Sequence, residues 1–474
     1  MVARPRGLPR TFPAGRPSAI APTPVSTAWI GCAAPTVRPH ALPGPSSRRG
    51  ACRHPSARSL PDMSSTSRRR PAVLASPPLS EALGRKNGFG LLRLVLASSV
   101  IFSHAMPLGM SKPSLGELSS RGQTDVGAIA VAGFFVLSGL LITRSGMRLS
   151  TARFLWNRAI RLLPGLWVCM LLTAFVIAPV VAYHQGRLDG FWSHPQNPFR
   201  YIEENWAIGV GQWGISGLLD HNPHAGAFNG SIWSLAYEVL CYLVVALFAA
   251  AGVFRRARWT MVLLVAGLYA FMFSLAVDYH HLQAPIYAKT GMSAWTLPFL
   301  GWIAPEQLIP VGFMFGLGAL AELYRKKLPI NDIAGVAALA VFLASCRYGA
   351  FTVVGLPAFA YGLLWLAARM PHPLTKVGTK ADLSYGIYIY AFPIQQCLTL
   401  WQVNRHGYTV YCALSVVLAT VAAFLSWHLV EKPSMRLKDL GLPRPSRPGP
   451  GENRPPAASA GGAAEPVAEV TAAR

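Results

Sequence analysis

Residues 89–106 read FGLLRLVLASSVIFSHAM, an apolar stretch long enough to cross a bilayer, because about 18 helical residues at about 1.5 Å each span its hydrocarbon core. Arg93 and His104 interrupt it. They are 11 residues apart, about three turns, so both side chains leave the same face of the helix. An ionisable pair inside a span is costly and indicates a functional site. The alternative is that Arg93 snorkels to one interface and His104 lies at the other.

The composition is typical of a membrane protein. Of the 474 residues, 52% are hydrophobic and 13% are charged, and the apolar residues form long blocks. The net charge of +24 comes from Lys and Arg in the tails and in short loops, as the positive-inside rule requires, so we expect no binding of nucleic acid. The seven cysteines stand singly and have no Cys/His spacing, which predicts neither a disulfide framework nor a metal site.

The sequence predicts an all-α polytopic fold with about ten transmembrane helices. Each apolar block is near the length needed to span a bilayer. The blocks cover residues 89–106, 126–143, 164–182, 231–253, 259–277, 298–321, 332–347, 350–369, 384–401 and 409–430.

Positive charge orients these spans. Basic residues gather in the loops after the second, fourth, sixth and eighth blocks, which we therefore place on the cytoplasmic side together with both termini. The segments left for the outside are 107–125, 183–230, 278–297 and 402–408. Arg93 then lies towards the cytoplasm and His104 towards the exterior, in the plasma (inner) membrane.

Both ends of the chain are predicted to be disordered. The basic segment 1–84 is rich in Pro and Arg and lacks hydrophobic periodicity, and the tail 436–474 is rich in Pro, Gly and Ala. Met63 is an alternative start of translation. Residues 85–435 form the predicted membrane domain.

The long outer segment 183–230 carries aromatic residues, among them Trp192, Trp206 and Trp213. Aromatic residues at membrane boundaries are usually interfacial anchors. The functional alternative is a platform for a sugar ring or a lipid-linked substrate.

The fourth span begins with a polar stripe. Ser231, Ser234, Glu238 and Tyr242 recur at spacings of three and four, which places them on one face of the helix. A carboxylate inside the membrane is costly unless it is paired or protonated, and a depth comparable to that of His104 favours a shared site. Packing between helices is the alternative explanation.

An arginine pair precedes the third span. In RFLWNRAIRLLPG, Arg158 and Arg161 share one face if the segment is helical. Positive-inside topology alone explains such charges. The alternative is a clamp for a cytosolic ligand that carries phosphates, which Arg binds in bidentate fashion.

Six motifs in succession resemble the membrane-bound acyltransferase family 3, over about residues 85 to 435. They are RLVLASSVIFSHA (93–105), GFFVLSGLLITRS (133–145), FLWNRAIRLLP (154–164), SIWSLAYEVLCYL (231–243), LSYGIYIYAFPIQQ (383–396) and LVEKP (429–433). The resemblance implies a sugar O-acyltransferase, which moves an acyl group, most often acetyl, from cytosolic acyl-CoA to a hydroxyl of a cell-envelope saccharide or glycolipid. It implies no bound cofactor, because acyl-CoA is a co-substrate.

The resemblance also implies the site residues. His104 matches the catalytic histidine of the family's Arg-X10-His element, and Glu238 matches the carboxylate of its Trp-Ser-Leu-x-x-Glu block, here expected to orient the imidazole. The residues assigned to substrate binding are Arg93, Arg158, Arg161, Trp233 and Ser138. Many members have an Asp where Gly133 stands and a His where Ala391 stands, so more of the chemistry rests on His104.

Two questions stay open at the level of the sequence. His104 is suited to act as a general base, and both direct transfer and an acyl-histidine intermediate fit that role. A transporter or flippase with an intramembrane path of Arg, His and Glu is the alternative function. No soluble domain follows the last span, so the enzyme is expected to work alone or with an unidentified envelope partner.

Overall fold

The computed structural model describes residues 76–84 and 86–439. The predictions of disorder at the two ends, and of a start at Met63, fall almost wholly outside these residues. Residues 76–84 contain helix α1 (Leu79–Ala82). The Leu79 amide donates a hydrogen bond of 2.7 Å to the Leu328 carbonyl oxygen, which fastens α1 to the segment after helix α10 (Pro305–Leu323).

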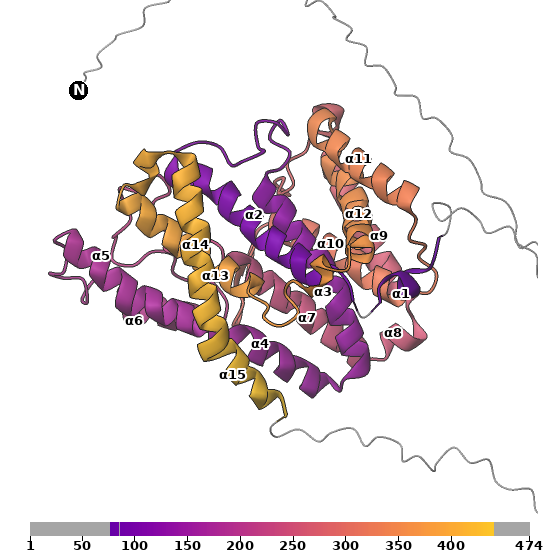
Figure 1. Cartoon of the computed structure of the whole chain (residues 1–474), viewed down its shortest axis with the longest axis horizontal. Helices are drawn as coiled ribbons and strands as arrows, with labels where there is room; N and C mark the ends of the chain where they lie inside the picture. Colours follow the sequence, from indigo (N-terminus) through magenta and orange to yellow (C-terminus); the bar gives the residue numbers. More distant parts are fainter. Residues whose placement is uncertain (1–75, 85, 440–474) are drawn as a thin grey trace, which may run out of the picture. The chain divides into compact units, whose positions relative to one another are not determined.

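The regular structure of the described chain is almost entirely helical, and a long helix corresponds to each of the ten apolar blocks (Figure 1). These are α2 (Phe89–Gly109), α3 (Val126–Arg148), α4 (Thr151–Leu172) continued by η2 (Thr173–Ile177) and α5 (Ala178–His184), α7 (Trp233–Ala250), α9 (Trp259–Ala276), α10 (Pro305–Leu323), α11 (Asp332–Tyr348), η4 (Phe351–Gly355) with α12 (Leu356–Arg369), α13 (Ser384–Leu400), and α14 (Tyr408–Ser426) continued by η7 (Trp427–Glu431), α15 (Lys432–Ser434) and η8 (Met435–Asp439).

Eight of these helices, within residues 76–84 and 86–439, are both long and apolar enough to cross a membrane. The other two, α11 and α13, have 17 residues each and fall just short in length. The prediction of an all-α polytopic membrane protein is confirmed, and the count of ten spans is approximate.

Two helices begin elsewhere than predicted. The third starts at Thr151 instead of residue 164, so that Arg158 and Arg161 lie on the same continuous helix as the span itself. The sixth starts at Pro305 instead of residue 298, with a proline in the first turn, where its missing amide hydrogen is not needed. The residues before it form a hairpin of β1 (Trp295–Leu297) and β2 (Gly301–Ile303).

Short helices fill several of the connecting segments. They are α6 (Pro198–Asn205), α8 (Val253–Arg256), η3 (His280–Leu282), η5 (Leu374–Lys376) and η6 (Val403–His406).

Helices α3 and α10 approach each other closely. A Cβ atom on Gly139 would overlap the Phe315 carbonyl oxygen, and one on Gly318 would overlap the Val136 carbonyl oxygen. Small residues of this kind let two membrane helices pack backbone against backbone.

A salt bridge also joins α3 to α10. Arg144 donates from Nε and Nη2 to the two carboxylate oxygens of Glu322, over 3.0 and 2.7 Å. The Glu322 side chain is 2% exposed, so this bidentate pair is buried. It fixes the register between the two helices.

Helix α13 packs against both α2 and α14 and has buried residues along nearly its whole length. Gln395 donates to the Ile101 carbonyl oxygen of α2 over 2.9 Å. Gln396 donates to the carbonyl oxygens of His224 and Ala227, over 2.8 and 2.7 Å. The segment before α7 is thereby held on α13, next to the face that carries Phe392.

Candidate active site

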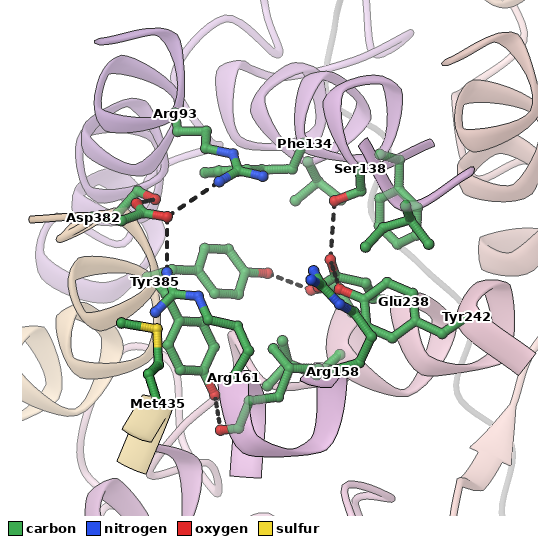
Figure 2. A pocket seen from close by; sticks show the side chains of 18 of the residues that line it. Arg93, Phe134, Ser138, Arg158, Arg161, Glu238, Tyr242, Asp382, Tyr385 and Met435 are labelled. Carbon is green, nitrogen blue, oxygen red and sulfur yellow. Dashed lines mark hydrogen bonds and ion pairs between the residues drawn. The ribbon is translucent and has the colours of Figure 1, made fainter. Parts of the chain in front are cut away.

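Five long helices and the C-terminal end of the described chain line a cavity of about 310 Å³ (Figure 2). This volume is at the lower end of the range typical of small-molecule sites. The residues that line it are Arg93 from α2; Val131, Phe134, Phe135, Ser138 and Ile142 from α3; Arg158, Arg161 and Leu162 from α4; Ser234, Leu235, Glu238 and Tyr242 from α7; Asp382, Ser384, Tyr385 and Tyr388 from α13 and the residues before it; and Trp427, Met435 and Lys438.

Basic side chains outnumber acidic ones in this lining. Three arginines and Lys438 face two carboxylates, those of Glu238 and Asp382. Figure 2 shows Arg93, Arg158 and Arg161 around the cavity. A hollow with an excess of positive charge favours an anionic ligand, because the field is focused between apolar walls.

Asp382 holds two of the arginines. Its Oδ2 accepts from Arg93 Nη1 over 3.1 Å and from Arg161 Nη2 over 2.8 Å, and its Oδ1 accepts from the Ser384 hydroxyl over 2.6 Å. Burial raises the pKa of Asp382, but Arg161 and Arg93 lower it by more, so that the pKa lies below its ordinary value. The carboxylate therefore stays ionised and keeps Arg93 and Arg161 together.

Arg161 is fixed from several sides. Its Nη1 donates to the Glu431 carboxylate over 2.7 Å, and Glu431 is only 2% exposed. Its guanidinium also lies 5.7 Å from the ring centroid of Tyr385 and 5.4 Å from that of Trp427. Such stacking orients a guanidinium as well as stabilising it.

Arg158 is less constrained. Among the described residues it forms no salt bridge, and its Nε atom is buried without a hydrogen-bond partner. A buried donor without a partner is costly, by about 1–3 kcal/mol or more for a charged group. Arg158 is thus the arginine of the cavity that no carboxylate of the described residues holds, and its donors are available to a ligand.

Glu238 lies in the same cavity and not beside His104. Its Oε1 accepts from the Ser138 hydroxyl over 3.0 Å and from the Tyr242 hydroxyl over 2.5 Å. No hydrogen bond, salt bridge or ring contact joins Glu238 to His104 in the part of the chain that the structure describes. The structure therefore brings Glu238 together with the predicted arginines and Ser138, and separates it from the predicted base.

His104 lies beyond the cavity, about three turns of α2 from Arg93. Its ring packs edge-on against Phe392, with 5.4 Å between centroids, and Phe392 also contacts the His224 ring at 5.8 Å. The His104 Nδ1 atom is buried and has no hydrogen-bond partner. An imidazole with an unused nitrogen retains the capacity to accept a proton.

Helix α13 links the cavity to His104. Tyr388 lines the cavity, and Phe392, four residues later, contacts His104. Residues four apart lie on the same face of a helix, about 6 Å apart along its axis. The basic cavity thus ends about one helical turn from the residue that packs on His104.

A family model described as an acyltransferase domain matches residues 86–428, most of the chain. This chain belongs to acyltransferase family 3. The resemblance that the sequence motifs indicated is thereby confirmed, and the chain is an acyltransferase, which sets aside the transporter alternative.

Two curated relatives of this acyltransferase align over most of its length. The chain is 28% identical over 355 residues to the O-acetyl transferase of Shigella phage Sf6, an alignment that covers 73% of this chain and 96% of that protein. It is 26% identical over 381 residues to Nodulation protein 10 of Rhizobium leguminosarum bv. viciae, covering 76% of this chain and 96% of that protein. No solved structure gives a significant match.

Trp233 of the acyltransferase does not line the cavity. It begins α7, and its ring packs edge-on against Tyr237 at 5.4 Å and Tyr287 at 5.8 Å. Of the residues predicted to bind substrate, the structure therefore gathers Arg93, Arg158, Arg161 and Ser138 in one cavity and places Trp233 outside it.

The sequence prediction gave no site role to Asp382, Tyr385, Tyr388, Glu431 and Lys438, and it named Tyr242 only as part of the polar stripe with Glu238. The two carboxylates among them had a signal in the sequence. Asp382 directly precedes the LSYGIYIYAFPIQQ motif, and Glu431 is the carboxylate of LVEKP. Their pairing with Arg161, from a motif more than 200 residues earlier, depends on tertiary contacts that the motifs do not specify.

Proposed function

We propose that this acyltransferase moves an acyl group, most often acetyl, from acyl-CoA to a hydroxyl group of a cell-envelope saccharide or glycolipid, with His104 as general base. The observation that carries the proposal is the arginine-lined cavity that ends about one helical turn from Phe392, the residue packed on His104. A donor held by its phosphates in the cavity has its acyl group directed towards the histidine.

The charges of the cavity support acyl-CoA as the donor. Guanidinium groups bind phosphate in bidentate fashion, and Arg158 has a buried donor atom still unpaired. Arg93 and Arg161 are already held by Asp382, so they supply a fixed positive field at the same mouth. In this proposal Arg158 makes the new contact to a phosphate, and the other two arginines keep the site preorganised.

The position of His104 supports its role as the base. It removes the proton of the acceptor hydroxyl as that oxygen attacks the thioester carbonyl. The C–S bond then breaks, and the imidazolium returns the proton to the departing CoA thiolate. An acyl-histidine intermediate is the second route, and it is distinguished by whether labelled acetyl from acetyl-CoA stays on the protein when no acceptor is present.

The location of the two substrates follows from the charge distribution. The basic loops support a cytoplasmic position for the arginine end of the cavity and for both termini, in the plasma (inner) membrane, on the side where acyl-CoA is available. His104 then lies towards the outer face. Transfer of an acetyl group is supported by the similarity to the phage relative, an O-acetyl transferase. An envelope partner protein that presents the acceptor also fits this arrangement.

Mass spectrometry tests the proposal in cells. Surface polysaccharides and glycolipids are compared between cells with the intact gene, with a deletion, and with the His104→Ala variant. Loss of one acyl mass increment in both mutants identifies the group moved and the acceptor. Envelope species that are unchanged in the deletion strain would contradict an acceptor in the cell envelope.

A further inference from the structure

Asp125 lies at the N-terminus of α3, next to the helix that carries His104. Its Oδ1 caps α3 by accepting from the Gly127 and Ala128 amides, over 2.7 and 3.1 Å. The same oxygen accepts from the hydroxyl of Ser103, the neighbour of His104 in α2, over 2.8 Å. Three donors therefore fix this carboxylate against the turn of α2 that carries the histidine.

The second oxygen of the carboxylate is unused. No described residue donates a hydrogen bond to Asp125 Oδ2, and His104 Nδ1 is buried without a partner. The charge of Asp125 acts on His104. Hydrogen bonds between catalytic groups are often long in the absence of substrate and tighten in the reacting complex.

Among the described residues, the ionisable groups whose charges act on His104 are Asp125 and His224. His224 is exposed and lies in the segment before α7. Helix α13 presents the Phe392 ring, and the α14 tyrosines, Tyr408 and Tyr411, donate to the carbonyl oxygens of Phe102 and Gln395.

The charge of Asp125 also acts on Tyr287, from the segment between α9 and α10. The Tyr287 hydroxyl is buried without a hydrogen-bond partner, and burial raises its pKa, so it stays a neutral phenol. Glu238, the carboxylate that the sequence favoured, is bound to Ser138 and Tyr242 inside the cavity. Among the described residues, Asp125 is thus the carboxylate that is placed to interact with the His104 imidazole.

We propose that Asp125 is the positioning residue of His104: it orients the imidazole and stabilises the imidazolium that forms when the acceptor hydroxyl loses its proton. This inference rests on the proposed function of His104 as the base. The logic is that of a histidine held by a carboxylate, in which the carboxylate does not itself take the proton. Gly133 and Ala391 carry no ionisable side chain, so neither of these positions supplies His104 with a charged partner.

The substitution Asp125→Asn removes the negative charge of the side chain and keeps the cap of helix α3. Asparagine caps a helix about as well as aspartate, and its carbonyl oxygen accepts the same bonds from Ser103, Gly127 and Ala128. Asp125→Ser is a second variant that keeps a cap and removes the carboxylate. Asp278→Asn is the matched control, since Asp278 is exposed in the segment between α9 and α10.

The measurement is the pH dependence of acetyl transfer from acetyl-CoA by the purified full chain. We expect kcat to fall by about 10-fold or more in Asp125→Asn and Asp125→Ser, because the imidazolium loses its counter-charge. We also expect the acid limb of the kcat/KM profile to move to lower pH, because a neutral neighbour favours protonation of the imidazole less. Asp278→Asn keeps the wild-type rate and profile.

The outcomes are distinguishable. Unchanged pH profiles and rates within twofold of wild type in both Asp125 variants, with His104→Ala inactive, would overturn the role of Asp125 and leave the proposed function intact. An active His104→Ala would overturn the proposed function itself. A rate that falls in the Asp125 variants with no shift of the profile would assign Asp125 a structural role only, and would equally reject the proposal.

Discussion

The three arginines of the cavity differ in what a substitution would reveal. Arg161 is tied to Glu431, so its removal leaves a buried carboxylate unpaired, at a cost of about 3–5 kcal/mol in stability. Arg158 has no such partner among the described residues. Donor binding is therefore tested more cleanly at Arg158.

We predict that Arg158→Ala weakens the affinity for acyl-CoA by about 10-fold or more, because a hydrogen bond to a charged group contributes about 1.5–3 kcal/mol. Titration calorimetry of the purified protein with acetyl-CoA measures this. Arg148→Ala is the matched control, since Arg148 is an exposed arginine at the end of α3. Equal donor affinity in the two variants would show that Arg158 does not bind acyl-CoA and that its charge serves only to orient the chain in the membrane.

Asp382 makes stability depend on pH in a defined direction. Its folded pKa lies below the ordinary value, so its contribution to stability is complete above about pH 4 and is lost as the pH falls through the folded pKa. We predict that the melting temperature of Asp382→Asn in detergent lies below that of the wild type at pH 7, and that the gap narrows below about pH 4. A gap that is constant with pH would show that the ion pairs with Arg93 and Arg161 do not stabilise the fold.

The sequence predicts which side chains of one helix share a face, but it does not predict which faces of two helices meet. The three-residue spacing of Arg158 and Arg161 placed both in the cavity, because a helix fixes their common face. Glu238 was assigned to His104 from its comparable depth in the membrane and from its match to the family's Trp-Ser-Leu-x-x-Glu block. Depth does not determine which faces of α2 and α7 are turned to each other, and Glu238 in fact binds Ser138 and Tyr242.

At the scale of elements, the close crossing of α3 and α10 allows a direct test of how the helices pack. We predict that Gly139→Ala lowers the stability by about 1–3 kcal/mol, since its Cβ atom overlaps the Phe315 carbonyl oxygen and the helices must separate. Thermal unfolding in detergent measures the change. Gly267→Ala in α9 is the control, because no atom lies within 4 Å of its added Cβ. Equal melting temperatures for the two variants would contradict the close crossing.

The apolar blocks located the helices well and their ends less well. Hydrophobicity marks only the part of a helix that lipid or core requires to be apolar. Helix α4 begins at Thr151, well before the predicted residue 164, because its first turns carry arginines and so have no apolar signal. The hairpin of β1 and β2 had the opposite effect, since its apolar residues extended the predicted sixth span backwards to residue 298.

At the scale of the whole molecule, the alternation of basic loops predicts the topology. We expect a cysteine placed at Leu118, which is 80% exposed in the segment between α2 and α3, to react with a membrane-impermeant maleimide on intact cells. One placed at Leu374, 42% exposed in the loop before α13, should react only after permeabilisation. Both are introduced into a chain whose native cysteines are replaced by serine. The reverse pattern of labelling would invert the membrane orientation and with it the side on which acyl-CoA enters.

The central claim is that donor binding and proton transfer occupy two places along α2, the cavity at Arg93 and the base at His104. The most direct measurement follows both steps in the purified protein, with labelled acetyl-CoA and envelope saccharide from a deletion strain as acceptor. We predict that His104→Ala binds acetyl-CoA with wild-type affinity and transfers no label, whereas Phe102→Ala, an exposed neighbour on the same helix, transfers normally. Transfer by His104→Ala at the wild-type rate would contradict the account.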